Sequence, residues 1–436
     1  MTIGLGRRRR WLSLNLPTTD EPYVGVRGAV PFVEGLLPEG DTVRSLVAER
    51  LSVDADDDLA LLAAIGRDAA GAVAVVPEGQ PSASGDAALQ PIDADDIGDR
   101  LRRLPRQPLS IDAQVRLSLG GAQPKMLLTR SDRRWHLPIH GAPSSHILKP
   151  SQDDRFPGMV ANEAFCMRTL KHAGLPAARV DVDDFGGVET LVVERFDRVA
   201  RNGRRLERLH QEDTAGALGV RPRDKYLTNA KTGVTYQRIA GLLDAFASQD
   251  DLRDLARLVT ANVALGNADA HGRNYGLVLD PDGTVRLAPA YDVVSTLAYG
   301  LTAHAIAVDG AQQHERLSTR RLLNEITTWG LPAREAETIV RDTLARLAEA
   351  VEPAREETPN LADSVLRRVR ANLTGPFAAD ADVAAQAQPA SSPRRHGSSS
   401  PPEPHDATAP ACGAWMPRAR ATCRRRPGHA GPHRRT

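Results

Sequence analysis

The chain has 436 residues, with 56 basic and 55 acidic side chains, 41% hydrophobic residues and three cysteines. This length favours two or three domains or a two-lobed body, and the composition is that of an ordinary globular protein. Three cysteines exclude a disulfide framework, and no apolar run is long enough for a signal peptide or a membrane-spanning helix. We therefore expect a cytoplasmic protein that does not associate with membranes.

Residues 10–91 have the pattern of a small α+β module. Short apolar runs predict strands, and periodic apolar positions predict helices. The expected elements are a strand at Trp11–Leu16, helices at Thr42–Leu51 and Leu59–Ile65, and a buried strand at Ala72–Val76. The polar, Gly- and Ser-rich run at residues 78–86 predicts a linker.

From Leu109 onward the pattern changes to short strands around one helix. We expect strands at Val115–Ser118, Lys125–Thr129, Trp135–Ile139 and His146–Lys149, a helix at Met159–His172, and strands at Arg179–Val182 and Glu189–Val193 joined by Gly186-Gly187. A Gly-Gly dipeptide between two strands is typical of a hairpin. Strands, one helix and then a hairpin are the order of elements in the small lobe of a kinase.

Residues 236–377 are largely helical, as expected for a kinase large lobe. The helices are interrupted by a polar loop at residues 267–274 and by a hairpin at Leu277–Leu287 with turn residues at its centre. From Ala378 onward the chain has nine arginines against four acidic residues and almost no apolar periodicity. This composition predicts a basic, disordered tail.

The polar loop at residues 267–274 carries the strongest chemical pattern. Phosphoryl transfer needs a carboxylate beside the attacking hydroxyl and an amide oxygen to hold metal, and kinases supply them as Asp and Asn five residues apart. Asp269 and Asn274 have this spacing, and Asp292 is placed to hold Mg²⁺. His271 either takes part in catalysis or braces the loop. Each residue alone is compatible with an ordinary loop, but the joint spacing favours the catalytic interpretation.

Several motifs in order along the chain, from about Trp11 to Phe377, resemble the HipA family of bacterial toxin kinases. They are Gly35–Gly40 (GLLPEG), Ile65–Val73 (IGRDAAGAV), Ser118–Lys125 (SLGGAQPK), His146–Pro150 (HILKP), Val193–Arg198 (VERFDR), His210–Asp213 (HQED) and Asn267–Asn274 (NADAHGRN). The first two look like the first domain of that family. The set is specific because its members recur in order.

The resemblance implies an α+β, two-lobed protein-kinase-like fold with a small amino-terminal α+β module and a disordered carboxyl-terminal tail. The expected divisions are the module at residues 1–105, a small lobe with the phosphate loop at 106–200, a helical large lobe with the catalytic loop at 201–377, and the tail at 378–436.

The resemblance also implies the nucleotide site. Lys149 would contact the ATP phosphates, with Glu163 as its ion-pair partner. The expected ATP-binding residues are Lys149, Gly120, Gly121, Ala122, Gln123, Glu194, Phe196, Asp197 and Gln211. Glu194–Phe196 would form the hinge that binds adenine through its backbone, and Asp197 would lie near the ribose. Ordinary alternatives are a solvated lysine at Lys149, a surface glutamate at Glu163 and a polar helix cap at Gln211.

The segment Ser118–Lys125 resembles the HipA loop that contacts ATP phosphates and carries an autophosphorylated serine. Ser118 is therefore the expected phosphorylation site, and an ordinary strand serine is the alternative. Gly120 and Gly121 would let backbone N–H groups approach the phosphates. Pro124 departs from the family, because it stands where an acidic or polar residue is usual and it removes one N–H donor.

The tail holds a pattern of possible metal ligands, C-x10-C-x5-H-x3-H. Its residues are Cys412, Cys423, His429 and His433. Two thiolates and two imidazoles could form a tetrahedral Zn²⁺ site, although the first gap is longer than usual. The alternatives are a disordered Arg-rich tail or arginines that contact nucleic acid.

The sequence thus predicts an ATP- and Mg²⁺-dependent protein serine/threonine kinase, the toxin of a toxin–antitoxin pair. By family analogy it would have a helix-turn-helix, HipB-like antitoxin as partner, would contact DNA only through that antitoxin, and would act on a protein such as an aminoacyl-tRNA synthetase. Two alternatives stay open: a small-molecule or lipid kinase, and a catalytically weak corepressor that acts with a DNA-binding partner.

Overall fold

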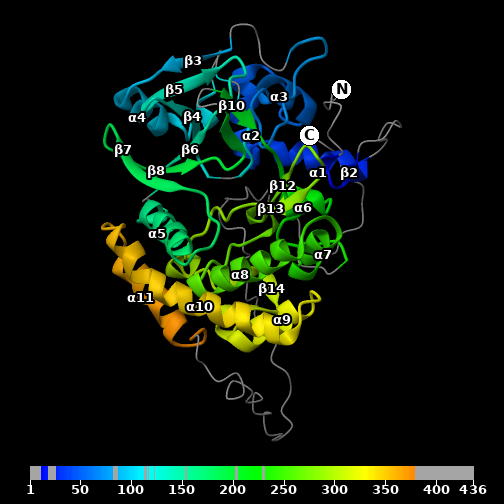
Figure 1. Cartoon of the computed structure of the whole chain (residues 1–436). Helices are drawn as coiled ribbons and strands as arrows, with labels where there is room; N and C mark the ends of the chain where they lie inside the picture. The colour runs from blue at the N-terminus through cyan, green and yellow to red at the C-terminus, as the bar shows by residue number, and fades with distance from the viewer. Residues whose placement is uncertain are drawn as a thin grey trace, which may run out of the picture.

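The computed structural model describes residues 11–17, 26–81, 87–111, 115, 117–121, 123–152, 155–201, 205–227 and 231–378. Figure 1 shows an amino-terminal module, a small lobe built around a sheet, and a large helical lobe that lies below them in this view. The predicted α+β class and two-lobed arrangement are confirmed. From residue 379 onward, the predicted disordered tail lies outside the described residues.

The amino-terminal module is a short hairpin followed by three helices. These are β1 (Trp11–Ser13), β2 (Leu16–Pro17), α1 (Val26–Leu36), α2 (Asp41–Leu51) and α3 (Asp58–Ile65). Helix α3 begins where the Asp57 carboxylate accepts hydrogen bonds from the backbone N–H groups of Leu59 and Ala60, which an α-helix would otherwise leave unpaired. Its buried leucines then pack against α1 to form the module's own core.

Two predictions for the module need correction. The single strand expected at Trp11–Leu16 is a pair of short antiparallel strands. The strand predicted at Ala72–Val76 is wrong, because this segment forms no sheet ladder. Val73 and Val75 are buried in the module core, and the backbone N–H of Val75 donates to Gly66 O. A short apolar run shows burial but does not by itself show strand pairing.

The small lobe is a six-stranded antiparallel sheet with the order β3-β5-β4-β6-β8-β7. Its elements are β3 (Ala88–Pro91), α4 (Ala94–Arg103), β4 (Met126–Ser131), β5 (Arg134–Ile139), β6 (His146–Pro150), α5 (Met159–His172), β7 (Val180–Phe185) and β8 (Val188–Glu194). The predicted helix at Met159–His172 and the hairpin across Gly186-Gly187 are confirmed. The strands expected at 125–129, 135–139 and 146–149 are also present, with ends that differ by up to two residues.

Helices α4 and α5 cover opposite faces of this sheet. Successive side chains of a strand point to opposite faces. On β8, Val192 packs in the cluster that contains α4, whereas Leu191 and Val193 pack in the cluster that contains α5. Helix α5 is therefore buried between the sheet and the large lobe.

The observed sheet moves the boundary between module and small lobe. Strand β3 pairs with β5, and α4 buries its apolar side chains against the small-lobe strands. Both elements belong to the small lobe, although the predicted boundary at residue 105 assigned them to the module. All four residues of β3 are exposed, so no apolar pattern marks this strand. The strand predicted at Val115–Ser118 is wrong, since Leu117 forms only an isolated bridge with Asp68.

The large lobe is mostly helical, with small sheets beside the cleft. Its helices are α6 (Thr214–Ala217), α7 (Tyr236–Phe246), α8 (Gln249–Leu265), α9 (Thr319–Thr327), α10 (Ala333–Glu356) and α11 (Asp363–Thr374). Its strands are β11 (His210–Asp213), β12 (Gly276–Leu279), β13 (Val285–Leu287), β14 (Ala303–Val308) and β15 (Ala311–Gln313), and β9 (Arg198–Arg201) with β10 (Arg205–Arg208) links the lobes. Short 3₁₀ helices are η1 (Pro108–Ser110), η2 (Pro222–Asp224), η3 (Gly272–Asn274), η4 (Thr296–Tyr299) and η5 (His314–Arg316).

Helices α8 and α10 organise the large lobe. Helix α8 begins with a capping box between Ser248 and Asp251 and ends at Gly266, whose φ of 76° is a left-handed conformation that favours glycine. The catalytic-loop sequence follows this turn directly. Helix α10 packs against α8 and also against α5 of the small lobe (Figure 1), so it joins the two lobes. Within the described ranges, no helix has the length and apolar character needed to cross a membrane.

Two helical glycines test the placement of α4. A Cβ atom at Gly98 would lie 2.3 Å from the carbonyl oxygen of Phe185, whereas a Cβ at Gly241 in α7 would meet nothing within 4 Å. We expect Gly98→Ala to lower the free energy of unfolding by about 1–3 kcal/mol, because α4 must move away from the hairpin. Gly241→Ala should raise it by about 0.5–1 kcal/mol through helix propensity. Urea unfolding monitored by circular dichroism measures both, and equal effects would contradict this packing.

Candidate functional site

The predicted site residues meet in a cavity between the module and the two lobes. Those that line it are Gly120, Gly121, Gln123, Lys149, Glu163, Glu194, Phe196, Asp197, Gln211, Asp269, His271, Asn274 and Asp292. Of the remaining predicted residues, Ala122 lies outside the described residues, and Ser118 is fully buried and does not line the cavity.

An ion-paired lysine lies at the centre of the cavity. Lys149 at the end of β6 places its Nζ 2.7 Å from Glu163 Oε1 on α5 and 2.6 Å from Asp292 Oδ1. Lys149 and Glu163 are 8% and 2% exposed, which excludes a solvated lysine and a surface glutamate. Burial alone would lower the pKa of Lys149, but the carboxylates of Asp292 and Glu163 outweigh it and raise that pKa above its usual value. The ammonium group is therefore charged and held in place.

Asp292 joins this lysine to the catalytic loop. Asn274 Nδ2 donates to Asp292 Oδ2 at 2.8 Å, and the backbone N–H of His271 donates to Asn274 Oδ1 at 3.2 Å. Asp292 has a φ of 60°, a strained conformation for a residue other than glycine, and such strain is found often at functional sites. Its side chain keeps 44% of its surface open, so its carboxylate is accessible from the cavity.

Asp269 has the environment of a proton acceptor. Its Oδ1 accepts a hydrogen bond from the Tyr226 hydroxyl at 3.0 Å. Burial raises the pKa of Asp269 to about 7, although the positive charge of Lys225 and the hydrogen bond from Tyr226 act in the opposite direction. A general base with a pKa near neutral both takes and releases a proton at physiological pH.

The geometry of His271 favours a bracing role. Burial lowers the pKa of its imidazole below the usual value, so the ring is neutral near pH 7. The ring packs edge-on against Tyr226 with centroids 5.4 Å apart. Together with the backbone hydrogen bond to Asn274, this packing holds the loop in shape.

The phosphate-loop segment is anchored by its ends. Gly121 has a φ of +102°, a left-handed conformation that residues other than glycine adopt only with strain, so glycine is favoured there. Lys125 Nζ donates to Gly120 O at 2.7 Å, and burial lowers the pKa of Lys125 to about 8. Ser118 is fully buried, and its hydroxyl donates to Leu36 O at 2.5 Å.

The hinge segment follows β8. Phe196 lines the cavity and stacks on Tyr291 with ring centroids 5.5 Å apart. Gln211 lies on strand β11, where it pairs with Val278, and not at a helix cap. The carboxylate of Asp197 does not stand free for the ribose contact expected from the sequence. It accepts hydrogen bonds from Arg195 at 2.9 and 2.8 Å and from Gly71 N at 2.7 Å, because it neutralises buried arginines.

The sequence did not reveal the part that Glu39, Arg273 and Lys225 play in the cleft. Glu39, between α1 and α2, places Oε2 2.8 Å from Lys225 Nζ and Oε1 in contact with the Arg273 guanidinium. Arg273 Nε also donates to Asp213 Oδ2 at 2.9 Å. Burial would raise the pKa of Glu39, but Arg273 and Lys225 lower it to about 2. Partners this far apart in sequence leave no local pattern, so the motifs that contain Glu39 and Arg273 did not indicate that these two residues pair.

Comparison with known proteins shows which family this chain belongs to. A model described as the HipA-like C-terminal domain matches residues 117–351, and one described as the HipA N-terminal domain matches residues 5–76. The chain belongs to the HipA family. It is 38% identical over 367 residues to Y4mE of Sinorhizobium fredii, covering 80% of this chain and 84% of Y4mE. It is 35% identical over 283 residues to the serine/threonine-protein kinase toxin HipA of Shewanella oneidensis, covering 62% and 63%.

A solved structure also matches this family member. It is the complex of HipA and HipB with operator DNA from Shewanella oneidensis, with a TM-score of 0.68, 30% identity and coverage of 80% of this chain and 84% of the matched chain. The HipA-like fold predicted from the sequence is therefore confirmed. Membership of a kinase family implies ATP and Mg²⁺ as reaction partners.

A zinc site finds no support. Cys412, Cys423, His429 and His433 lie outside the described residues. Within the described ranges, no group of three or more His, Cys, Asp or Glu side chains could hold a metal ion. Asp292 and Asn274 form a smaller set, one carboxylate and one amide, which suits Mg²⁺ that takes its other ligands from phosphates and water.

Lys225 provides a test of the electrostatics at Asp269. The rate of phosphate transfer should rise with pH as Asp269 loses its proton, because only the carboxylate accepts the proton of an acceptor hydroxyl. Lys225→Met removes a cation that lowers the pKa of Asp269. The midpoint of the pH–rate profile should therefore move upward by about 1 pH unit. Lys225→Arg keeps the charge and should keep the midpoint. The same midpoint in both variants would rule out this role of Lys225.

Proposed function

We propose that this protein is an ATP- and Mg²⁺-dependent protein serine/threonine kinase and the toxin of a toxin–antitoxin pair. One observation carries the proposal. Lys149, Asp292 and Asn274 are linked by direct contacts of 2.6 and 2.8 Å, and Asp269 lines the same cavity. Phosphoryl transfer needs a fixed cation, a carboxylate and an amide that bind metal, and a base whose pKa is near 7.

The cavity suits a nucleotide with its metal. Lys149 would contact the phosphates, and the backbone N–H groups at Gly120 and Gly121 would approach them without a Cβ atom in the way. Asp292 and Asn274 would hold Mg²⁺, which neutralises charge on the phosphates when bound. The hinge backbone from Glu194 to Phe196 would bind adenine, and the half-buried Phe196–Tyr291 stack gives that end an apolar surface.

Asp269 then acts on the acceptor. A serine or threonine hydroxyl would take the place that the Tyr226 hydroxyl now occupies beside Asp269 Oδ1. The oxygen of the acceptor hydroxyl forms a bond to the γ-phosphorus. At the same time, the bond from that phosphorus to the β,γ-bridging oxygen breaks. The hydroxyl proton passes to Asp269, and ADP leaves. Glu163 would hold the charged ammonium group of Lys149 beside the phosphates during this step.

Ser118 is the proposed autophosphorylation site. Its hydroxyl is fully buried against Leu36 O, and its backbone N–H donates to Asp68 O at 3.0 Å. A phosphate group does not fit in this place, so modification requires the loop to leave the module. Phosphorylation of Ser118 would thereby remove Gly120 and Gly121 from the nucleotide.

We propose a helix-turn-helix antitoxin as the protein partner. The HipA of Shewanella oneidensis has been solved together with HipB and operator DNA, and this chain is similar to it over most of its length. DNA contact would then occur only through the antitoxin. The substrate would be a protein such as an aminoacyl-tRNA synthetase. The kinase itself would act in the cytoplasm.

The base assignment is tested by Asp269→Asn, which keeps the size of the side chain. We expect the transfer of radiolabelled phosphate from ATP to protein to fall at least about 100-fold, because the proton acceptor is lost. Asp280→Asn, on the β12–β13 hairpin, is the control and should keep full activity. Unchanged labelling in Asp269→Asn would refute the assignment, and label confined to small molecules or lipids would refute a protein kinase.

The modification site is tested by Ser118→Ala. Mass spectrometry should find phosphate on residue 118 of the wild type after incubation with Mg²⁺ and ATP, and none on this peptide in the variant. Substrate phosphorylation should continue at its initial rate for longer in the variant than in the wild type, because the unmodified loop stays in place. Phosphate on another residue at wild-type level, with Ser118 unmodified, would contradict the proposal.

A further inference from the structure

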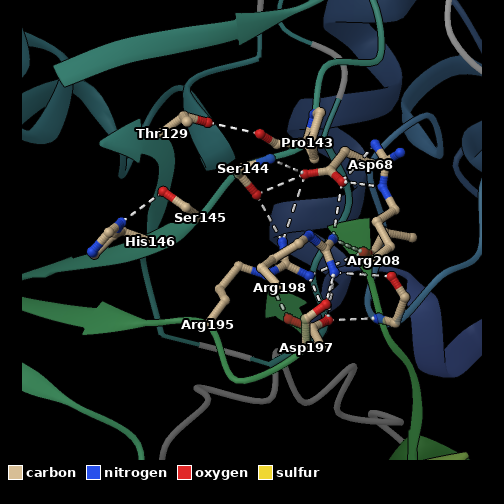
Figure 2. A network of polar contacts seen from close by, with 12 residues as sticks. Asp68, Thr129, Pro143, Ser144, Ser145, His146, Arg195, Asp197, Arg198 and Arg208 are labelled. Atoms are coloured by element: carbon tan, nitrogen blue, oxygen red, sulfur yellow. Dashed lines mark hydrogen bonds and ion pairs between the residues drawn. The ribbon is translucent and has the colours of Figure 1, made fainter. Parts of the chain in front are cut away.

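Five charged side chains gather beside the hinge and form what we call the hinge cluster: Asp68, Arg195, Asp197, Arg198 and Arg208. Figure 2 shows these side chains pointing toward one another. Asp68 comes from the module, in the loop after α3. Arg195 lies in the hinge, Asp197 directly after it, Arg198 at the start of β9 and Arg208 at the end of β10. Asp68 is 0% exposed, and Arg195, Arg198 and Asp197 are between 3% and 6% exposed.

Both oxygens of Asp68 are occupied. Oδ1 accepts from Arg198 at 2.9 Å and from Arg208 at 3.0 Å. Oδ2 accepts from the backbone N–H of Ser144 at 2.9 Å and from its hydroxyl at 2.7 Å, and it lies 3.7 Å from Arg195 (Figure 2). Despite burial, the three arginines hold the pKa of Asp68 far below its usual value. Asp68 is therefore a fixed anion among hinge cations.

The backbone after Asp68 also binds the hinge. Ala69 O accepts from Arg195 at 3.1 Å and from Arg198 at 2.8 Å. Gly71 N donates to Asp197 at 2.7 Å. A Cβ atom at Gly71 would lie 2.7 Å from the backbone nitrogen of Gln211, so this segment lies directly against a cavity-lining strand.

The same segment reaches the other end of the nucleotide site. Asp68 O accepts from the backbone N–H of Ser118 at 3.0 Å, and Asp68 forms a bridge with Leu117. Ser118 begins the phosphate loop. Residues 68–71 of the module therefore connect that loop with the hinge at Glu194–Phe196.

Loss of the Asp68 charge would unbalance the cluster. The cluster contains three guanidinium groups and two carboxylates, so Asp68→Asn leaves three cations against one anion in a buried place. A buried charge without its partner is strongly unfavourable, and the hinge would shift to separate the arginines. Burial and the neighbouring Arg195 already lower the pKa of Arg198, which shows how closely the cations are crowded.

We propose that Asp68 is a positioning residue for nucleotide binding: the module uses it to set the hinge relative to the phosphate loop. The inference rests on the proposed function for the presence of a nucleotide. It makes the amino-terminal module a part of the ATP site, although Asp68 itself does not line the cavity.

A positioning role predicts a particular kinetic pattern. If the hinge is correctly placed only part of the time, the apparent affinity for ATP falls by that fraction, while saturating ATP restores the competent arrangement. We expect Asp68→Asn to raise the Kd for Mg²⁺-ATP and the KM for ATP about tenfold, with kcat changed less than about threefold. A purely structural role would instead reduce the amount of active protein and leave Kd and KM unchanged.

The experiment measures Kd for Mg²⁺-ATP by titration calorimetry on the full chain, with thermal unfolding of each variant as a check. Asp58→Asn is the matched control, because Asp58 lies on α3 of the same module and pairs with Arg44 away from the hinge. A Kd for Asp68→Asn within twofold of that for Asp58→Asn would overturn the proposal. Failure of the wild-type chain to bind ATP would instead refute the proposed function.

A milder pair of variants keeps the test valid if Asp68→Asn does not fold. Ser144→Ala removes a hydroxyl that donates to Asp68 and accepts from Arg195 at 2.8 Å. Ser145→Ala removes the adjacent hydroxyl, which contacts Arg130 N and His146 and lies outside the hinge cluster (Figure 2). We expect Ser144→Ala to weaken ATP binding about threefold and Ser145→Ala to leave it unchanged. Equal Kd values in the two variants would overturn the proposal.

Discussion

The shared ammonium group of Lys149 is the interaction on which the cleft depends. It draws together a carboxylate from the small-lobe helix and one from the large lobe, at 2.7 and 2.6 Å. Removal of the Lys149 ammonium group would leave both carboxylates without their shared cation, and Glu163 is buried, so this loss would be strongly unfavourable. Lys149 thus joins the two lobes across the cleft, and Asn274 extends the same contact to the catalytic loop through Asp292.

Much of the site could be predicted because phosphoryl transfer restricts residue type and spacing within short segments. Asp269, Asn274 and Asp292 followed from such spacing, and the helix at Met159–His172 followed from apolar periodicity. Glu39 and Asp68 could not be assigned roles in this way, because their ion-pair partners lie more than 100 residues away. Asp197 lines the cavity as its motif predicted, but nothing in the sequence indicated that its carboxylate is hydrogen-bonded to the buried Arg195 and to Gly71 N.

The fold shows the same division. Apolar runs in the sequence predict strands β4, β5 and β6. Strand β3 is exposed at every residue, so only its pairing with β5 in the structure identifies it as a strand. Conversely, Val73 and Val75 are apolar because they fill the module core and not because they form a strand. Burial is encoded locally, but the identity of a partner strand is decided by the tertiary structure.

The position of α10 bears on how a nucleotide enters and leaves. This 24-residue helix is packed against α5 of one lobe and α8 of the other, and the amino-terminal module bridges both lobes on the side of the cleft. With restraints at both ends, a wide swing of the lobes would break extensive apolar packing. A short loop secured by a few hydrogen bonds moves at far lower cost. Ser118 is held to the module by two hydrogen bonds, to Leu36 O and Asp68 O, so release of this point costs less than separation of the lobes.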